Sequence, residues 1–330
     1  MKKVLATVLA VAMLATMAMG CGSKPAAEDE VVTLKLGMVD NESTPYYKGA
    51  MKIAENVEAA TNGKVKIEVI AGGALGGERD MVDAAAAGDL DIATAANSVV
   101  KNYIEEMAIL DQAYLWVDAD QAHAAVDGTL GDLIEEKALA KGLHVLGYME
   151  SGFRNVFSVK PVKTMADFAG VKIRTMENNY HMAAFEAFGA IPTPMASTEQ
   201  FNALQTGAID ACENAVSNCW NNKFYDITKN ITWSNHAYVY ILVCMSDAAW
   251  NKIPEDLRDD VAKAIEEGAQ AERQYLVDAN AEAVENLKGV GVEFHDIDVP
   301  ALQKAYQDAA AAKGFTFDAT WQAAVDEVTK

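Results

Sequence analysis

Two arginine side chains are the groups in this chain best suited to hold a ligand. The sequence contains five arginines against 22 lysines, and Arg154 and Arg174 each lie beside an apolar run that predicts a β-strand. The planar guanidinium group binds a carboxylate through two parallel hydrogen bonds. Side chains at strand ends in an α/β sheet commonly line a ligand crevice. The two arginines therefore predict a binding site for a small organic acid.

A competing interpretation is that one or both arginines pair with internal acids. The sequence has 48 acidic residues and a formal net charge of -21. A surface this acidic repels nucleic acid and anionic lipid, so we expect no nucleic-acid partner. It also repels an anionic ligand, which means that a site for an acid needs local positive charge.

Residue patterns typical of catalytic and metal sites are not found. The five histidines have no metal-binding spacing, and none lies in a nucleophile motif. The glycine-rich loop at 72–77 lacks the phosphate-binding pattern. We therefore expect no cofactor, no metal and no enzymatic activity. An exported α/β enzyme acting on a carboxylate substrate is the alternative.

Three cysteines follow the N-terminal region at irregular spacing, namely Cys212, Cys219 and Cys244. An odd number of irregularly spaced cysteines does not form a disulfide framework. We expect small buried apolar side chains, although Cys212 and Cys219 would pair if the fold brought them together.

The N-terminus has the pattern of a secretion signal. Two lysines and an apolar stretch at 4–18 precede Gly20 and Cys21. The stretch is short for a membrane span, which takes about 20 apolar residues, so residues 1–20 are predicted to be a signal peptide. Glycine before cysteine resembles a bacterial lipobox. We expect export to the periplasm or the outer face of the cytoplasmic membrane, anchored by lipidated Cys21, with 21–31 as a flexible tether.

The elements that must position the arginines alternate between strand and helix. The pattern is β-α-β-α-β from residue 32 to residue 93, which favours a mostly parallel sheet. The predicted elements are a strand at 33–38, a helix at 45–60, a strand at 64–70, a helix at 78–87 and a strand at 89–93. A second alternation extends to about residue 225.

Longer elements follow. Strands are predicted at 143–148 and 154–160, and the apolar strand at 236–245 is long enough to run from one sheet into another. A helix at 255–288 would span about 50 Å at 1.5 Å per residue. That length exceeds one domain, so the helix would brace two. A pair of shorter helices broken near Gly268 is the alternative.

A series of short motifs along the chain resembles a known family. In order they are GM at 37–38, LGGER at 75–79, GFRN at 152–155, KPV at 160–162, DFAGVKIR at 167–174, FGAIPTPM at 188–195, ALQTGAID at 203–210, EN at 213–214, KFY at 223–225 and NH at 235–236. Together they resemble the solute-binding subunits of tripartite ATP-independent periplasmic (TRAP) transporters, the DctP family. The resemblance covers essentially the whole mature chain.

This resemblance implies an α/β, two-domain periplasmic-binding-protein-like fold with a hinge, a ligand cleft and a long domain-bracing helix. Domain I would comprise 32–151 plus 240–279, and domain II 152–239 plus 280–330. The implied function is capture of a small organic acid and its delivery to the small and large TRAP membrane subunits for ion-gradient-driven uptake. The protein would be a monomer.

The resemblance also implies roles for single residues. Arg174 would be the main carboxylate ligand, Arg154 a second one and Asn214 a hydrogen-bonding pocket residue. This sequence has Ala211 where the family usually has glycine and Ala215 where proline is common. The first change reduces backbone freedom near Asn214.

Specificity would come from the variable side of the cleft. The candidates, chosen by position, are Val39, Asp40, Glu78, Asn97, Ser197, Trp220 and Tyr238. Apolar Val39 and Ala96 argue against a sialic acid. The candidate ligands are an aromatic or branched monocarboxylate, a dicarboxylate and a uronic acid. Trp220 and Tyr238 could stack on a ring, but aromatic residues at such spacing are more often part of the core.

Overall fold

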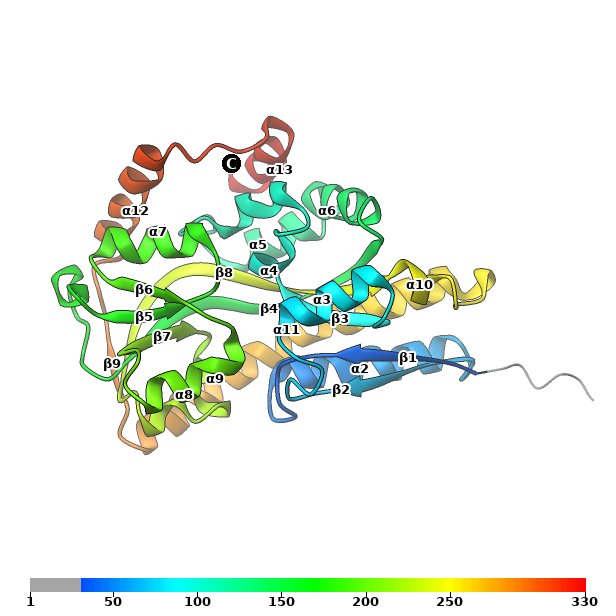
Figure 1. Ribbon diagram of the computed structural model, residues 1–330, viewed down its shortest axis with the longest axis horizontal. Coiled ribbons are helices and arrows are strands. Elements are labelled where there is room, and N and C mark those ends of the chain that lie inside the picture. The colour runs from blue at the N-terminus through cyan, green and yellow to red at the C-terminus, as the bar shows by residue number, and fades with distance from the viewer. Residues whose placement is uncertain (1–30) are drawn as a thin grey trace, which may run out of the picture. The chain divides into compact units, whose positions relative to one another are not determined.

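The computed structural model describes residues 31–330. The predicted signal peptide, Cys21 and all but the last residue of the tether lie outside the described residues. Figure 1 shows strands and helices alternating along the chain. The helices are α2 (Pro45–Ala60), α3 (Glu78–Ala87), α4 (Asn97–Val100), α5 (Ala119–Val126), α6 (Thr129–Leu139), α7 (Asn179–Phe188), α8 (Gln200–Gln205), α9 (Val216–Asn221), α10 (Asp247–Trp250), α11 (Arg258–Gly289), α12 (Val299–Lys313) and α13 (Ala319–Thr329).

The strands form one nine-stranded sheet in the order β2-β1-β3-β8-β4-β7-β5-β6, with β9 paired to β8. They are β1 (Val32–Gly37), β2 (Val65–Ile70), β3 (Ile92–Ala96), β4 (Leu143–Ser158), β5 (Lys172–Thr175), β6 (Ile191–Pro194), β7 (Ala211–Asn214), β8 (Asn230–Ser246) and β9 (Glu293–His295). Short parallel pairs lie at both sides, and the long antiparallel strands β4 and β8 join them. We call β1, β2 and β3 with α2 and α3 the first half, and β5, β6 and β7 with α7, α8 and α9 the second half.

The long strands differ from the sequence prediction. The two strands predicted at 143–148 and 154–160 are a single 16-residue strand, and the strand predicted at 236–245 begins earlier, at Asn230. The polar residues around Ser151 interrupt the apolar pattern of β4, but bulges near Glu150 and Gly152 let its pairing with β8 continue. Both long strands therefore run through the two halves as parts of one sheet (Figure 1).

Local signals fix the elements of the first half. Thr44 caps α2 by accepting a hydrogen bond from the Tyr47 amide, and Pro45 opens the helix. Gly88 ends α3 in a left-handed conformation. Because the following turn bonds its amides back to α3, β3 starts at Ile92, three residues later than predicted.

The predicted long helix exists as α11, one unbroken helix of 32 residues and about 48 Å. The alternative of two helices broken near Gly268 is wrong. Val261 and Leu276 pack in a core cluster with the first half, whereas Leu287 packs in one with the second half. The helix therefore contacts both halves, as the bracing role requires.

Two glycines explain how closely α11 packs on α2. A Cβ added to Gly268 would lie 2.7 Å from the Cα of Ile53, and one added to Gly49 would lie 2.7 Å from the Cβ of Glu272. Real Cβ atoms do not approach that closely, so glycine is needed at both positions. Gly268 is thus a packing residue and not a helix breaker.

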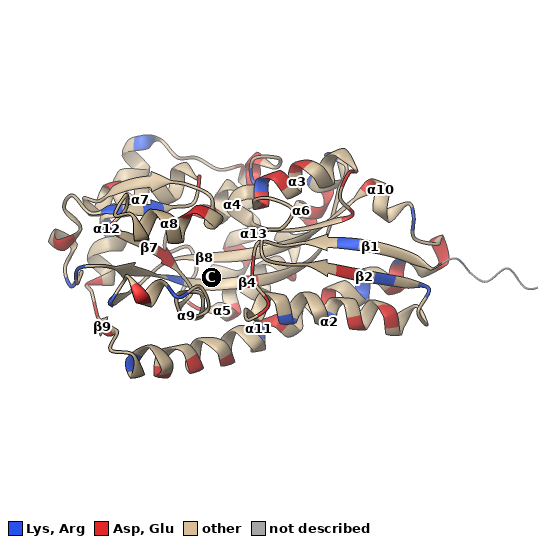
Figure 2. Cartoon of the chain, turned by 60° about the horizontal axis from the view of Figure 1, so that its bottom comes forward, with Lys and Arg blue, Asp and Glu red and all other residues tan. Residues whose placement is uncertain are grey.

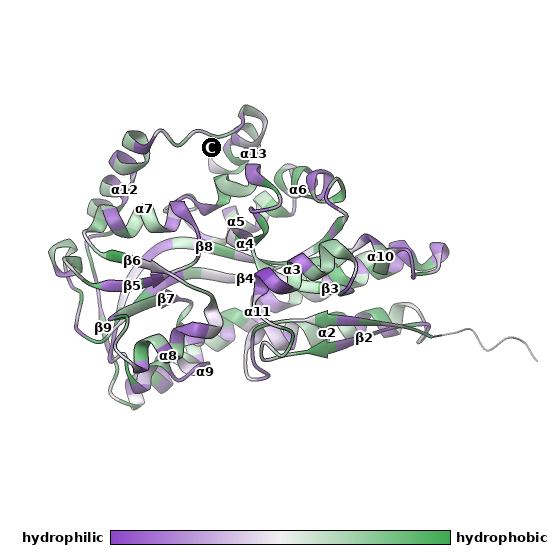
Figure 3. Cartoon of the chain, in the orientation of Figure 1, coloured by the Kyte–Doolittle hydropathy of each residue, from purple (hydrophilic) through white to green (hydrophobic). Residues whose placement is uncertain are grey.

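The outer faces of the helices are polar. Figure 2 shows acidic residues spread over many elements, including α2, α3 and α11, and Figure 3 shows hydrophilic and hydrophobic residues interleaved along the helices, as expected for helices with one buried face. Within residues 31–330, no helix has both the length and the apolar character needed to cross a membrane.

Replacing Gly268 with alanine tests the close contact between α2 and α11. The added Cβ forces the helices apart, and overpacking of this kind costs about 1–3 kcal/mol, against a gain in helix propensity of up to ~1 kcal/mol. We expect a lower free energy of unfolding by urea denaturation. Gly289→Ala is the matched control, because an added Cβ there meets nothing within 4 Å. If Gly268→Ala is as stable as Gly289→Ala, the close packing of the two helices is contradicted.

Candidate functional site

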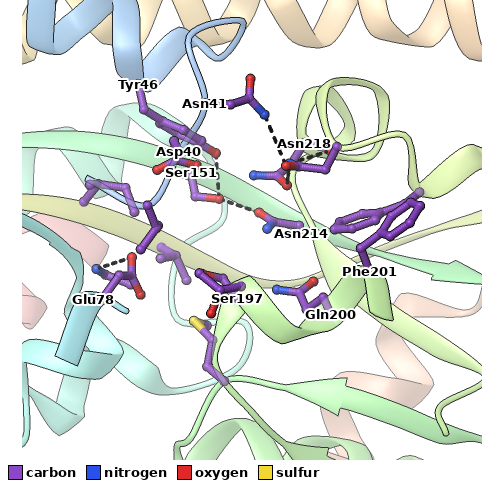
Figure 4. A pocket seen from close by; sticks show the side chains of 18 of the residues that line it. Asp40, Asn41, Tyr46, Glu78, Ser151, Ser197, Gln200, Phe201, Asn214 and Asn218 are labelled. Atoms are coloured by element: carbon purple, nitrogen blue, oxygen red, sulfur yellow. Dashed lines mark hydrogen bonds between the residues drawn. The ribbon is translucent and has the colours of Figure 1, made fainter. Parts of the chain in front are cut away.

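A cavity of about 320 Å³ lies where the two halves of the fold meet the long strands. The first half and the loop after β1 contribute Val39, Asp40, Asn41, Tyr46, Gly72, Glu78 and Ala96; the long strands contribute Ser151, Arg154, Val239 and Ile241; the second half and its loops contribute Arg174, Met176, Ser197, Thr198, Gln200, Phe201, Asn214, Asn218, Asn222 and Phe224. Figure 4 draws the side chains of 18 of these residues and labels ten of them. The lining is predominantly polar.

Arg154 is bound internally. It is 3% exposed, and its Nε and Nη2 both bond the carboxylate of Glu213, with Nη2 2.9 Å from Oε1. Nη1 donates to Oδ1 of Asn214 at 2.9 Å and to Oγ of Ser151 at 3.2 Å. The competing interpretation in the sequence, an arginine paired with an internal acid, therefore describes Arg154, although this residue also lines the cavity.

Arg174 is less completely paired. Its Nε and Nη2 donate to the carbonyl oxygen of Met195 at 3.0 and 2.8 Å, whereas Nη1 lies 3.5 Å from Oε1 of Glu213. Burial lowers the pKa of Arg174, and the attraction of Glu213 does not fully offset this. A buried guanidinium with one weakly bonded nitrogen at a cavity wall is a favourable place for an anion.

The buried carboxylate of Glu213 accepts hydrogen bonds from both arginines. Burial by itself would raise its pKa, but Arg154 and a hydrogen bond from His236 hold the pKa well below the usual range. His236 Nε2 lies 3.3 Å from Oε2 of Glu213. The carboxylate therefore stays ionised and compensates the buried positive charge.

The orientation of Asn214 is fixed by three donors. Its Oδ1 accepts from Oγ of Ser151 at 2.9 Å, from Nη1 of Arg154 and from the amide of Ala215 at 2.8 Å. Among residues 31–330 the side-chain amide nitrogen has no hydrogen-bond partner, so it can donate to a ligand in the cavity. Ala211 does not disturb this arrangement, because it lies in the extended strand β7, where glycine is not required.

Two acids line the cavity from the first half. Burial, and then the nearby Glu78, raise the pKa of Asp40 to about 7. Burial also raises the pKa of Glu78, although the Ala96 amide, 3.2 Å from its Oε1, and the two arginines act in the opposite direction. Asp40 and Glu78 thus lie at the cavity, as the sequence predicted, and their ligand contacts stay predictions.

Three predicted site residues are not brought to the cavity. Asn97 is fully buried and bonds Asp111 and the Tyr240 amide. Trp220 stacks on Tyr225 with ring centroids 4.9 Å apart, and Tyr238 bonds Glu150 and His123.

The cause is side-chain direction, which spacing alone does not reveal. Neighbouring residues of a strand face opposite sides, so Val239 reaches the cavity and Tyr238 does not. On the helical segment around α9, Asn218 and Asn222 share one side, four residues apart, and Trp220 lies between them on the other.

Several lining residues were missed in the sequence, among them Tyr46, Ser151, Gln200, Phe201, Asn218 and Asn222. The spacing of Asn214, Asn218 and Asn222 at intervals of four is a signal that could have found two of them. Tyr46 and Ser151 had no such signal. They are joined by a hydrogen bond of 3.2 Å between residues 105 positions apart.

The three described cysteines are buried free thiols, as preferred from the sequence. Burial raises the pKa of Cys219 and Cys244 to about 12. Cys212 and Cys219 do not pair.

The family model of the bacterial extracellular solute-binding proteins, family 7 (DctP), matches residues 36–315. The chain belongs to this family. A solute-binding protein of Verminephrobacter eiseniae is 34% identical over 244 residues, which cover 74% of this chain and 73% of the relative.

Solved TRAP periplasmic solute-binding proteins share the fold. One from Bordetella bronchispeptica is 34% identical with a TM-score of 0.85, covering 89% of this chain and 99% of that protein. One from Polaromonas is 30% identical with a TM-score of 0.85, covering 90% and 98%. The predicted two-domain periplasmic-binding-protein fold is confirmed for this DctP protein, as is the resemblance to the TRAP solute-binding subunits.

The raised pKa of Asp40 predicts how the stability of this DctP protein depends on pH. The folded carboxyl titrates near pH 7 and the unfolded one near 3.8, so the folded state binds more protons between those values. Its contribution to stability is full below about pH 4 and is lost as the pH rises through about 7. Asp40→Asn should flatten this part of the profile of unfolding free energy against pH, measured by urea denaturation without added ligand. Parallel profiles for both proteins would contradict the assignment.

Proposed function

We propose that this DctP protein captures a small organic acid outside the cytoplasmic membrane and delivers it to TRAP membrane subunits for uptake driven by an ion gradient. The single observation that carries the proposal is Arg174 at the cavity wall, with one weakly bonded guanidinium nitrogen. The free amide nitrogen of Asn214 supplies a second donor at the same cavity.

The size of the cavity and the ligands of related proteins support a small acid. A volume of about 320 Å³ is at the lower end of the usual range for ligand pockets, roughly 300–1,000 Å³. The Bordetella structure has density assigned to pantoate, and the Polaromonas structure contains D-erythronate. Both ligands are small monocarboxylates with hydroxyl groups.

We further propose that ligand binding closes two domains about a hinge. The predicted domains, 32–151 plus 240–279 and 152–239 plus 280–330, meet where β4 is bulged and Gly152 has φ 63°. A hydrogen bond of 3.3 Å from Asn41 to Asn222 already links the two sides of the cavity. A ligand that contacts both sides would favour the closed arrangement.

A binding role is favoured over the exported-enzyme alternative. The cavity is lined by the guanidinium group of Arg174 and the side-chain amide of Asn214. A positive charge beside hydrogen-bond donors suits the capture of an anion. Incubation of the purified protein with a bound acid, followed by mass spectrometry of the recovered acid, separates the two. Conversion of the acid would support the enzyme.

Replacement of Arg174 by lysine tests the carboxylate site. Lysine keeps the charge and loses the planar fork, so affinity should fall about tenfold or more. The measurement is isothermal titration calorimetry with the tightest acid found in a panel that includes pantoate and D-erythronate. Arg258→Lys is the control, because Arg258 lies beside Trp250 and away from the cavity. Equal affinity for Arg174→Lys and the unaltered protein would remove Arg174 from the site.

The proposed location is the outer face of the cytoplasmic membrane, where a lipid on Cys21 would anchor the protein. We also propose that the protein is a monomer. Support for the anchor comes from the sequence alone, in which Gly20-Cys21 follows the apolar stretch. Cys21→Ser should move the protein from the membrane fraction to the soluble exported fraction in cells of the source organism. An exported mature protein whose mass shows no lipid on Cys21 would contradict the anchor.

A further inference from the structure

The cavity has acids on one side and donors on the other. Asp40 follows β1 and Glu78 opens α3, so both reach the cavity from the first half. Asn214 and Arg174 reach it from the second half. Figure 4 shows Asp40 and Glu78 on the side opposite Asn214. A ligand whose carboxylate lies at Arg174 and Asn214 therefore extends toward two carboxyl groups.

The charged side chains around the cavity can compensate one carboxylate of the ligand but not two. Two bonds from Arg154 and one weak bond from Arg174 already engage the carboxylate of Glu213. Asp40 and Glu78 bring further negative charge to a partly enclosed site, where like charges repel more strongly than in water. A second carboxylate on the ligand would lie against these acids without a cation of its own.

Both acids keep hydrogen-bonding capacity. The Glu78 carboxylate accepts from the Ala96 amide through Oε1, and the Asp40 carboxyl accepts from its own amide. An ionised carboxylate has about four acceptor positions, so each group has positions left. Neutral polar side chains, including Ser197, Gln200 and Asn218, also line the cavity.

Hydroxyl groups match the polar lining of the cavity better than an ammonium group does. A hydroxyl group both donates and accepts, whereas an ammonium group only donates. Several neutral amides and hydroxyls around the cavity also match a ligand with several hydroxyl groups.

We propose that the ligand is a hydroxylated monocarboxylate, whose hydroxyl groups bind Asp40 and Glu78 and whose carboxylate lies at Arg174 and Asn214. The two acids would thereby determine specificity by excluding dicarboxylates. This inference rests on the proposed function and assigns the substrate class of the same site.

The test is calorimetric titration of the purified mature protein with two sets of acids. The first set contains the hydroxylated monocarboxylates D-erythronate, pantoate, D-gluconate and D-glucuronate. The second contains the dicarboxylates succinate, fumarate and L-malate. We expect the tightest ligand to come from the first set and to bind at least about tenfold more tightly than any dicarboxylate. L-Threonine, which adds an ammonium group to a hydroxylated acid, should bind more weakly than the tightest ligand.

The variants Asp40→Asn and Glu78→Gln, singly and together, assign the discrimination to these side chains. Removing the negative charges should narrow the ratio of monocarboxylate to dicarboxylate affinity by about tenfold in the double variant. Asp89→Asn is the matched control, because Asp89 is exposed and does not line the cavity. Thermal melts establish whether each variant is folded. If a variant does not fold, the titrations of the unaltered protein still decide the ligand class.

A dicarboxylate as the tightest ligand would overturn this inference and leave the proposed function intact. An unchanged affinity ratio in the folded double variant would remove Asp40 and Glu78 as its cause. Tighter binding of L-threonine than of every hydroxylated acid would overturn the hydroxyl assignment in favour of an ammonium group. Binding of none of these acids, together with no acid released from the purified protein, would contradict the proposed function itself.

Discussion

The buried ion pair between Arg154 and Glu213 is the interaction on which the site depends. Glu213 is fully buried in β7, and its carboxylate bonds Arg154 of β4, faces Arg174 of β5 and accepts from His236 of β8. Removing one partner of such a pair typically costs about 3–5 kcal/mol, because the other charge is left uncompensated. The pair therefore connects the strands that carry the cavity residues Arg154, Arg174 and Asn214.

This cluster explains how a strongly acidic protein can hold an anion. The chain has a net charge of -21, but screening limits the effect of distant surface charges to about 8 Å at physiological salt. Inside the cavity, the electrostatic potential is therefore set mainly by the nearest charged groups. Glu213 satisfies Arg154 and leaves Arg174 with a weakly bonded nitrogen, so the positive potential is concentrated at one wall.

The arrangement also connects the two halves of the fold. Tyr46 of α2 bonds Ser151 of β4, and Ser151 bonds Asn214 of β7 at 2.9 Å. Ser151 lies at the bulged part of β4, between the strand segments that pair with the two ends of β8. A ligand that binds Asn214 is therefore connected through Ser151 to Tyr46. This series of hydrogen bonds joins the two halves at the point where β4 passes from one to the other.

The sequence by itself determined the alternation of elements, the limits of α2 and α3 and the long helix, and it singled out Arg174 and Asn214, which both line the cavity. These follow from short-range signals, such as the Thr44 cap and the regular spacing of apolar residues, and from motifs read in order. Tertiary structure decided that Arg154 pairs with Glu213, 59 residues away, that Gly268 packs on Ile53, and that Val239 faces the cavity instead of Tyr238. Such contacts depend on strand order and register, and a shift of one residue turns a side chain to the opposite face.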